Sequence, residues 1–396
     1  MKRVYTTVAL TCAAVLILFG AWIYDQNASV IQGTLKVGFI YENDEITPYT
    51  YNFSLARDEV EKTFGDRVEI LTASNVPENE TEQPLRELVR KGCRLIFINS
   101  YCEQVREWAA EYPNVQFCQV SFGTERAEDA PENYHTFKGK IYQGRYITGI
   151  AAGMKIREMM ATGQVTGDQP LLGYVAAYPT AEVISGYTAF LLGARSVAPE
   201  ATMRVRYTGA WSSYSMEKEA VYALAEAGCM VISQHTDTLG TAVACEEIAQ
   251  ERPIYHISYN QNMMDVAPTA TLTGTRINWA PYITGAVGAV LQGRKIESAV
   301  AGDENGNDLS GGMAEDWVEV LDLNTLNAAA GTQEAMDEAA EQFLRGRKGN
   351  VFQGDYTGVN PDNAADTIDL KNGYTENEHY SSPSFHYVLD GVVFID

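Results

Sequence analysis

Cysteine and histidine are scarce in this sequence, which holds six of the first and five of the second among 396 residues. No two cysteines stand at Cys-x-x-Cys spacing and no two histidines at His-x-x-x-His spacing, so the patterns typical of zinc sites are missing. Five cysteines lie outside the apolar N-terminal stretch, an odd number, and three of them lie in or beside apolar runs. We therefore predict buried free thiols without a disulfide framework, and neither a metal nor a cofactor.

Basic residues are outnumbered, because 29 lysines and arginines stand against 52 aspartates and glutamates, for a net charge of −23. Such a surface repels phosphate backbones, so we expect no nucleic-acid partner. Phosphate-binding glycine loops are also missing after the first predicted strand. The loop at 41–53 is instead long, acidic and aromatic, and its Tyr49, Tyr51 and Phe53 can stack on a planar ring.

The stretch Ser-Gln-His-Thr-Asp-Thr at 233–238 places His235 and Asp237 directly after an apolar run. A hydrolytic triad needs a nucleophile, but the sequence has no Gly-x-Ser-x-Gly elbow. We therefore predict no catalytic residues and interpret the pair as hydrogen-bonding groups against a bound ring. A structural alternative stays open, in which His235 braces the loop and Asp237 caps the helix that begins near Thr241.

The N-terminus combines Lys2 and Arg3 with an uncharged stretch at 4–24. A basic start followed by an apolar segment is typical of an export signal, and about 20 apolar residues suffice to span a bilayer as a helix. We expect an uncleaved membrane anchor, with a cleaved signal as the alternative. Cys12 lies too early and in too poor a context for a lipoprotein signal.

From Thr34 onward, short apolar runs alternate with amphipathic stretches, which indicates an α/β fold with parallel sheets covered on both faces. The first series of predicted strands is 34–41, 67–73, 94–99 and 115–121. After a helix at 141–160, a second series follows at 171–178, 202–208, 229–234, 253–259 and 270–275. Two series predict two doubly wound lobes. A helix at 279–292, a hairpin-like region and a helix at 331–346 come next, and 350–383 is expected to wrap the surface irregularly.

Ligands of open α/β sheets lie beyond the carboxyl ends of the strands. In this sequence those ends are 41–44, 99–101, 121–122, 178–182, 208–211, 234–237 and 259–262. Trp211 follows a strand in a Gly/Ser-rich loop, and Asn278 precedes Trp279 at a helix start, where the asparagine can alternatively cap the helix. The predicted ligand-binding residues are Asn43, Asp44, Tyr49, Tyr51, Phe53, Ser100, Tyr101, Tyr178, Glu182, Trp211, Gln234, His235, Asp237, Asn260, Asn278 and Trp279.

Several segments, in order from about residue 34 to 295, together resemble one family. They include "YQGRYITGIAAG", "AGCMVISQHTDT" and "NWAPYITGAVGAVLQG". The set resembles the basic membrane protein family, substrate-binding proteins of ABC importers that include purine-nucleoside receptors. The resemblance implies a type I periplasmic-binding-protein fold, with two Rossmann-like lobes joined by a three-crossover hinge. It assigns 33–124 with 276–300 to lobe 1 and 125–275 with 301–396 to lobe 2, after an anchor and linker at 1–32.

This resemblance implies a protein outside the cytoplasm, tethered to the membrane, that delivers a purine-type ligand to an ABC permease and its ATPase. In nucleoside receptors of the family, a lysine near the helix at 279 helps hold the ribose. Here no lysine occurs between Lys218 and Lys295, so we expect a free base in preference to a nucleoside. The alternatives are a ligand-sensing module for a membrane signalling partner and a nucleoside-processing enzyme.

In the mechanism we expect, closure of the lobes places the ring between aromatic side chains of opposite lobes, Tyr49 or Phe53 on one side and Trp211 or Tyr178 on the other. The polar edges of the ring are read by Asn43, Asp44, Ser100, Gln234, His235, Asp237 and Asn260. Closure also desolvates the ligand, so that each polar edge left unpaired weakens binding.

Overall fold

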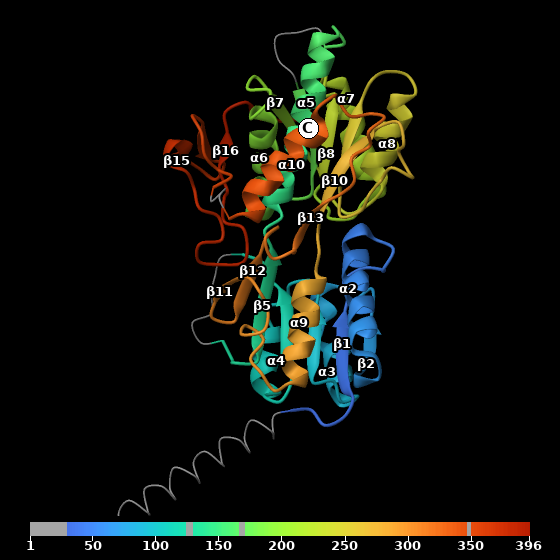
Figure 1. Ribbon diagram of the computed structural model, residues 1–396, viewed down its shortest axis with the longest axis vertical. Helices are drawn as coiled ribbons and strands as arrows, with labels where there is room; N and C mark the ends of the chain where they lie inside the picture. The colour runs from blue at the N-terminus through green and yellow to red at the C-terminus, as the bar shows by residue number, and fades with distance from the viewer. Residues whose placement is uncertain (1–29, 124–129, 166–170, 347–349) are drawn as a thin grey trace, which may run out of the picture.

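The computed structural model describes residues 30–123, 130–165, 171–346 and 350–396. They form two α/β lobes stacked along the long axis of the molecule (Figure 1). The first sheet has the strand order β11(Asp303–Asn305), β12(Asp308–Gly311), β5(Tyr134–Gly139), β4(Gln116–Val120), β3(Leu95–Ile98), β1(Leu35–Ile40) and β2(Val68–Ala73). The second has the order β13(Val318–Val320), β10(Thr271–Ile277), β9(Tyr255–Tyr259), β8(Val231–His235), β6(Leu171–Ala176), β7(Thr202–Tyr207) and β17(Val392–Phe394).

Both sheets are parallel except for β11 and β13, which pair antiparallel at the edges. We call the first sheet with its helices lobe 1 and the second lobe 2. In lobe 1, α2(Pro48–Phe64) and α9(Ala280–Leu291) cover one face, and α3(Glu82–Arg90) and α4(Val105–Glu111) the other. In lobe 2, α5(Tyr142–Ala161), α6(Ala181–Arg195) and α10(Thr332–Leu344) lie opposite α7(Tyr214–Glu226) and α8(Gly240–Ala249). Covered faces explain the continuous apolar strands, such as the fully buried β3.

The buried cores also hold the cysteines. Cys93, Cys102, Cys118, Cys229 and Cys245 are all free and buried, which confirms the prediction for the described part of the chain. Burial raises the pKa of the Cys93 thiol to about 11 and that of Cys229 to about 12. Thiols that stay protonated are poor nucleophiles, so these residues act as small core side chains.

The chain crosses between the lobes three times, from β5 to α5, from β10 to α9 and from β12 to β13. This agrees with the hinge that the resemblance implied. The boundaries at 125 and 301 were wrong, however, because β5, β11 and β12 pair within the sheet of lobe 1. The sequence of β5, Tyr-His-Thr-Phe-Lys-Gly, is largely polar and lacks the apolar run by which a strand is detected.

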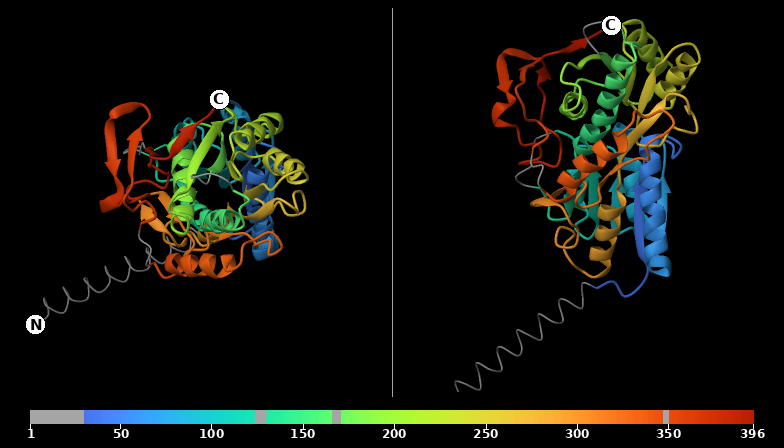
Figure 2. Two further views of the ribbon diagram at one scale, coloured as in Figure 1. Left: turned by 90° about the horizontal axis from the view of Figure 1, so that it is seen from above. Right: turned by 45° about the horizontal axis from the view of Figure 1, so that its top comes forward.

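The C-terminal segment is more regular than predicted. β14(Thr357–Asn360), β15(Asn363–Asp369) and β16(Val388–Leu389) form a three-stranded antiparallel sheet, and β17 extends the sheet of lobe 2. The two views of Figure 2 show this segment standing out from one side of lobe 2. The prediction of an irregular 350–383 was wrong because β15 is mostly exposed and carries no apolar alternation.

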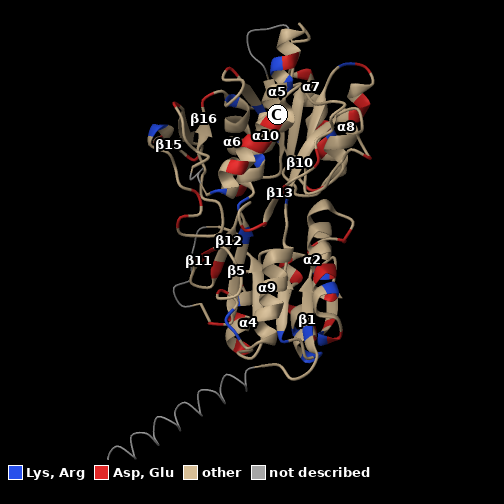
Figure 3. Cartoon of the chain, in the orientation of Figure 1, with Lys and Arg blue, Asp and Glu red and all other residues tan. Residues whose placement is uncertain are grey.

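No helix within the described ranges is long and apolar enough to cross a membrane. The anchor predicted at 4–24 lies outside the described residues. Acidic side chains lie on both lobes, on α2 of lobe 1 and on α8 and α10 of lobe 2 (Figure 3). The negative charge of the sequence therefore does not mark one face as a docking surface.

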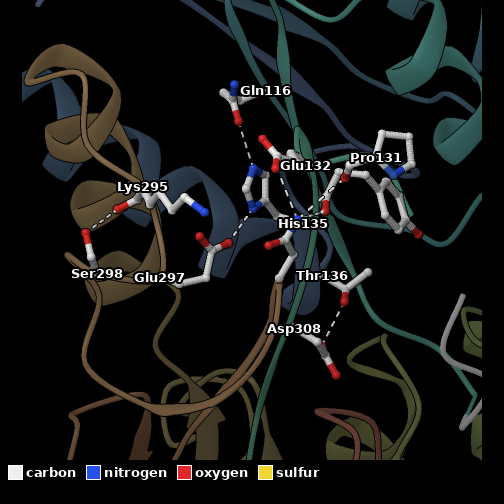
Figure 4. A network of polar contacts seen from close by, with 11 residues as sticks. Gln116, Pro131, Glu132, His135, Thr136, Lys295, Glu297, Ser298 and Asp308 are labelled. Carbon is white, nitrogen blue, oxygen red and sulfur yellow. Dashed lines mark hydrogen bonds and ion pairs between the residues drawn. The ribbon is translucent and has the colours of Figure 1, made fainter. Parts of the chain in front are cut away.

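A buried polar network fixes the polar strand β5 in lobe 1 (Figure 4). His135 Nδ1 lies 2.5 Å from Glu297 Oε1, and His135 Nε2 lies 2.8 Å from Gln116 Oε1. Burial by itself would raise the pKa of Glu297, but the hydrogen bond and charge of His135 outweigh it, so the pKa lies below 4.5. The network explains how a strand with few apolar residues is held in the sheet.

Replacing Glu297 with glutamine should destabilise the protein at pH 7 by about 1.5–3 kcal/mol, the usual contribution of a hydrogen bond to a charged group. The pKa of Glu297 is lower in the folded protein than in the unfolded chain. The contribution to stability is therefore complete above the unfolded pKa of 4.5 and is lost as the pH falls through the folded pKa. The difference between the variant and the wild type should therefore shrink on acidification, as measured by urea unfolding. The exposed Glu304→Gln is the control, and an equal loss in both variants would contradict the prediction.

Candidate functional site

A cavity of about 350 Å³ lies between the lobes, at the carboxyl ends of both sheets. That volume is within the range of small-molecule sites. Lobe 1 supplies Glu42, Asn43, Tyr49, Glu78, Asn99, Ser100, Tyr101, Val120, Ser121, Phe122 and Lys138. Lobe 2 supplies Glu182, Trp211, His235, Thr236, Asp237, Tyr259 and Asn260.

Direct contacts across the cleft show that the lobes are closed on one another. The Tyr49 backbone N–H donates to Asp237 Oδ1 at 2.6 Å, and Asn52 Nδ2 donates to Asn260 Oδ1 at 3.2 Å. Lys138 Nζ lies 2.9 Å from Glu182 Oε2. The cavity is therefore enclosed by residues of both lobes that contact one another directly.

Asp237 follows β8 and lines the cavity, where burial strongly shifts the pKa of its carboxyl group. Burial raises its pKa to about 8 against the lowering effect of the Tyr49 N–H, and the nearby Glu217 raises it further. Glu217 holds the loop itself, because its carboxylate accepts hydrogen bonds from the Thr238 N–H at 3.1 Å and the Thr241 hydroxyl at 3.4 Å. Asp237 thus reaches across the cleft and does not cap α8, so the structural alternative for this residue is wrong.

His235 is the last residue of β8 and is almost fully buried. Burial first, then the positive charges of Arg145 and Lys138, lower its pKa well below 6.5, so the ring is neutral at pH 7. Its Nδ1 lies 3.4 Å from the Tyr174 hydroxyl and its Nε2 lies 3.9 Å from Glu182 Oε1. When Tyr174 donates to Nδ1, Nε2 carries the proton and is a donor into the cavity.

Arg145 of α5 is buried behind the cavity wall and contacts residues of β8 and β9. Its Nη1 donates to the Gln234 carbonyl at 2.8 Å, and its guanidinium lies 3.9 Å from the centre of the Tyr259 ring. Tyr259 in turn contacts His235, with ring centres 4.8 Å apart. A rigid support of this kind fixes the orientation of the groups in contact with a ligand.

Four polar atoms of cavity-lining residues lack a hydrogen-bond partner among the described residues. They are the Ser100 hydroxyl of lobe 1 and, in lobe 2, His235 Nε2, the Thr236 hydroxyl and Asn260 Nδ2, all shielded from solvent. A buried polar atom without a hydrogen bond costs about 1–3 kcal/mol. A ligand with polar edges facing both lobes would supply the missing hydrogen-bond partners.

Aromatic side chains complete the wall. Trp211 of lobe 2 packs edge-on against Tyr178 and His235, with ring centres 5.6 and 6.4 Å apart. In lobe 1, Phe122 lies 6.1 Å from Tyr101 and remains 45% exposed, the exposure of a side chain at the mouth of a cavity. These rings offer flat apolar faces from opposite lobes.

Of the residues predicted from sequence, the structure brings together Asn43, Tyr49, Ser100, Tyr101, Glu182, Trp211, His235, Asp237 and Asn260 around this cavity. Glu78, Val120 and Lys138 also line it and were missed. Lys138 lies near the end of the undetected β5, so the missing strand concealed its place at the carboxyl edge.

Four predicted aromatic contacts do not line the cavity. Phe53 and Trp279 are fully buried in lobe 1 and stack on each other with ring centres 4.4 Å apart. Tyr51 is 40% exposed on α2, and Tyr178 is 37% exposed and packs edge-on against Trp211. Tyr49 and Phe53 lie on the same face of α2, one turn apart, with ring centres 5.4 Å from each other. Only Tyr49, at the start of the helix, reaches the cavity, whereas Phe53 is buried in the core of lobe 1.

Three predicted polar contacts also lie elsewhere. Asp44 is exposed and is not among the residues that line the cavity. The Gln234 side chain is buried, where it binds the Thr236 carbonyl and lies 2.9 Å from His256 Nε2. Asn278 accepts from the Ala280 N–H at 3.2 Å, which is the helix-start role that was left open.

With this geometry established, comparison with known proteins identifies the family. The sequence model described as ABC transporter substrate-binding protein PnrA-like matches residues 36–347. The chain belongs to this family. A purine-binding protein of Brucella abortus (strain 2308) is 32% identical over 275 residues, which are 67% of this chain and 72% of that protein. A Haloferax volcanii protein, named as a glucose-binding protein of an ABC transporter, is 28% identical over 306 residues, 76% of this chain and 70% of its own.

Solved structures agree with the fold of this substrate-binding protein. A solute-binding protein of an ABC transporter from Aeropyrum pernix K1 aligns with a TM-score of 0.61 at 14% identity, over 79% of this chain and 92% of its own. One from Conexibacter woesei gives 0.58 at 16% identity, over 79% and 97%. These relatives and neighbours are solute-binding proteins and not enzymes.

Proposed function

We propose that this PnrA-like protein binds a purine base in the interlobe cavity, outside the cytoplasm, and delivers it to an ABC permease. The observation that carries the proposal is a closed cavity with aromatic faces from both lobes and unpaired polar atoms in its wall. A purine has the matching chemistry, a flat apolar face and a rim of hydrogen-bond donors and acceptors. The Brucella relative, named as purine-binding, supports this ligand class.

In this proposal the ring lies between Trp211 of lobe 2 and the aromatic residues Tyr101 and Phe122 of lobe 1. Stacking of a base on an aromatic side chain contributes about 1–3 kcal/mol. Asp237 accepts from ring or exocyclic N–H groups, and His235 and Ser100 supply the complementary polar contacts. Because all three side chains are buried, a ligand lacking these edges leaves them unpaired and binds weakly.

A nucleoside is the second candidate, and Lys138 is the observation that favours it. The sequence has no lysine near residue 279, but the fold brings Lys138 into the cavity from β5. Its ammonium group is paired with Glu182 at 2.9 Å, and a charged pair of this kind can bind the hydroxyl groups of a ribose. We therefore keep the base as first candidate and test the nucleoside beside it.

Calorimetry and thermal unfolding with adenine, guanine, adenosine, guanosine and glucose test the proposal. A ligand at 1,000 times its Kd should stabilise the protein by about 4 kcal/mol. We expect at least one purine base to bind, and more tightly than its nucleoside. Binding of glucose without any purine would overturn the proposed ligand class.

Tethering and delivery are separate parts of the proposal. We propose that the segment at 4–24 anchors the protein to the membrane, on the hydropathy of its sequence. Intact mass of membrane-extracted protein should equal that of the uncleaved chain, and a shorter mass would show cleavage. Delivery requires that purine uptake in cells depend on this protein.

A further inference from the structure

The segment from 350 to the C-terminus lies beyond the residues that the family model matches, 36–347. Within it, residues 374–385 leave lobe 2, contact lobe 1 at Ser381 and return to lobe 2. In Figures 1 and 2 the C-terminal part of the chain extends from β15 and β16 along the side of the molecule toward β11 and β12. This non-covalent connection is additional to the three crossings of the chain.

On lobe 2 the segment is held by its apolar residues and by one buried carboxylate. Phe352, Leu370, Phe385 and Leu389 are buried in the core that α5 and α6 form. The Glu376 carboxylate, which is 7% exposed, accepts from the Ser185 hydroxyl of α6 at 3.0 Å and from the Phe385 N–H at 3.0 Å. This end of the segment therefore moves with lobe 2.

On lobe 1 the contacts are made by Ser381, which is 2% exposed. Its hydroxyl lies 2.5 Å from the Ser121 hydroxyl, and its N–H donates to Asp308 Oδ2 at 2.7 Å. Asp308 is itself oriented by the Thr136 hydroxyl, which donates to Oδ1 at 2.8 Å. The His379 carbonyl also accepts from Asn305 Nδ2 of β11.

We propose that residues 374–385 form an interlobe strap, which stabilises the closed lobes and positions the cavity wall through Ser381. Ser121 lines the cavity beside Phe122, so the strap acts one residue from the proposed aromatic contact. Opening of the lobes must separate Ser381 from Ser121 and Asp308, because Glu376 stays with lobe 2. The strap therefore slows opening, and Ser381 is a positioning residue for ligand binding.

The double variant S381A/D308A tests the strap without disturbing the core of lobe 2. Truncation is unsuitable because five apolar residues of the segment from 350 onward, Val351 included, are buried in the core of lobe 2. Spin labels at the exposed positions of E61C on lobe 1 and Q250C on lobe 2, in a C12S background, report the distance between the lobes without ligand. We expect the distance distribution of the double variant to broaden toward longer values. The variant T357V, which loses a hydroxyl contact to Asp390 inside the segment, is the control and should match the wild type.

The ligand readout rests on the proposed function. Loss of a charge-assisted hydrogen bond predicts a rise of about tenfold or more in the purine dissociation rate of S381A/D308A. The single variant S381T keeps Asp308 and has a hydroxyl at position 381, so its purine dissociation rate should be close to the wild-type value. Unchanged interlobe distances in the double variant would overturn the strap. If the interlobe distance is longer in the double variant but the wild-type protein binds no purine, the strap is supported and the proposed function is refuted.

Discussion

Replacing Asp237 with asparagine should stabilise the ligand-free protein at pH 8 and weaken purine binding at the same pH. Burial raises the pKa of Asp237 to about 8, from an ordinary value of 3.8. Between these values the unfolded chain is ionised while the folded carboxyl holds its proton, so stability falls as the pH rises. Asparagine does not titrate and therefore avoids this loss.

The difference in the free energy of unfolding between Asp237→Asn and the wild type depends on pH. It should vanish near pH 3.8, grow through neutral pH and level off above about 8. Each pH unit in this window corresponds to about 1.4 kcal/mol, so we expect a gain of about 2 kcal/mol or more at pH 8. Urea unfolding of both proteins across the range measures it. A variant less stable than the wild type at pH 8 would contradict the raised pKa.

Binding should change in the opposite direction. A purine N–H donates to an ionised Asp237, so wild-type affinity should rise with pH up to about 8 as the proton is released on binding. The amide of the variant accepts more weakly, and loss of a charged hydrogen bond of about 1.5–3 kcal/mol predicts a decrease of about 10- to 150-fold. The affinity of Asp237→Asn should also be flat with pH. Equal pH dependence in both proteins would exclude Asp237 as the titrating contact.

Two tryptophans should respond in opposite ways to replacement by alanine. Trp279 is fully buried between Phe53 and Phe137, with ring centres 4.4 and 5.5 Å away, so Trp279→Ala should lower the free energy of unfolding by about 3–5 kcal/mol. Trp211 lies in the cavity wall and is only partly buried. Its replacement should cost less stability and reduce purine affinity by about 5- to 150-fold, the loss of one stacking contact.

This pair of variants separates a core residue from a cavity residue of the same type. Urea unfolding and calorimetry on both proteins give the comparison. Under conditions where Trp279→Ala remains folded, its purine affinity should stay within a few fold of the wild type. A large affinity loss at Trp279 with little destabilisation would reverse the two assignments.

The candidate site was predicted where strands could be recognised. His235 ends β8, and Asp237 and Trp211 lie in the loops after β8 and β7 of lobe 2, where the carboxyl ends of parallel strands meet at one edge. Lys138 was missed because β5 is polar and depends on the buried His135–Glu297 pair for its place in the sheet. Such a strand is stabilised by side chains distant in sequence, and local pattern cannot reveal it.

The sequence by itself determined the α/β class, the two series of strands and the side chains available at their ends, because these follow from local periodicity and composition. Only the tertiary structure decided which of those side chains face the cavity. Phe53 and Tyr49 lie one helical turn apart, yet Phe53 is in the core while Tyr49 lines the cavity and its backbone N–H donates to Asp237 across the cleft. Likewise, only folding brings Ser381 against Ser121, across 260 positions of the chain. Contacts of this range depend on how two lobes and a C-terminal segment close on one another, which no local pattern encodes.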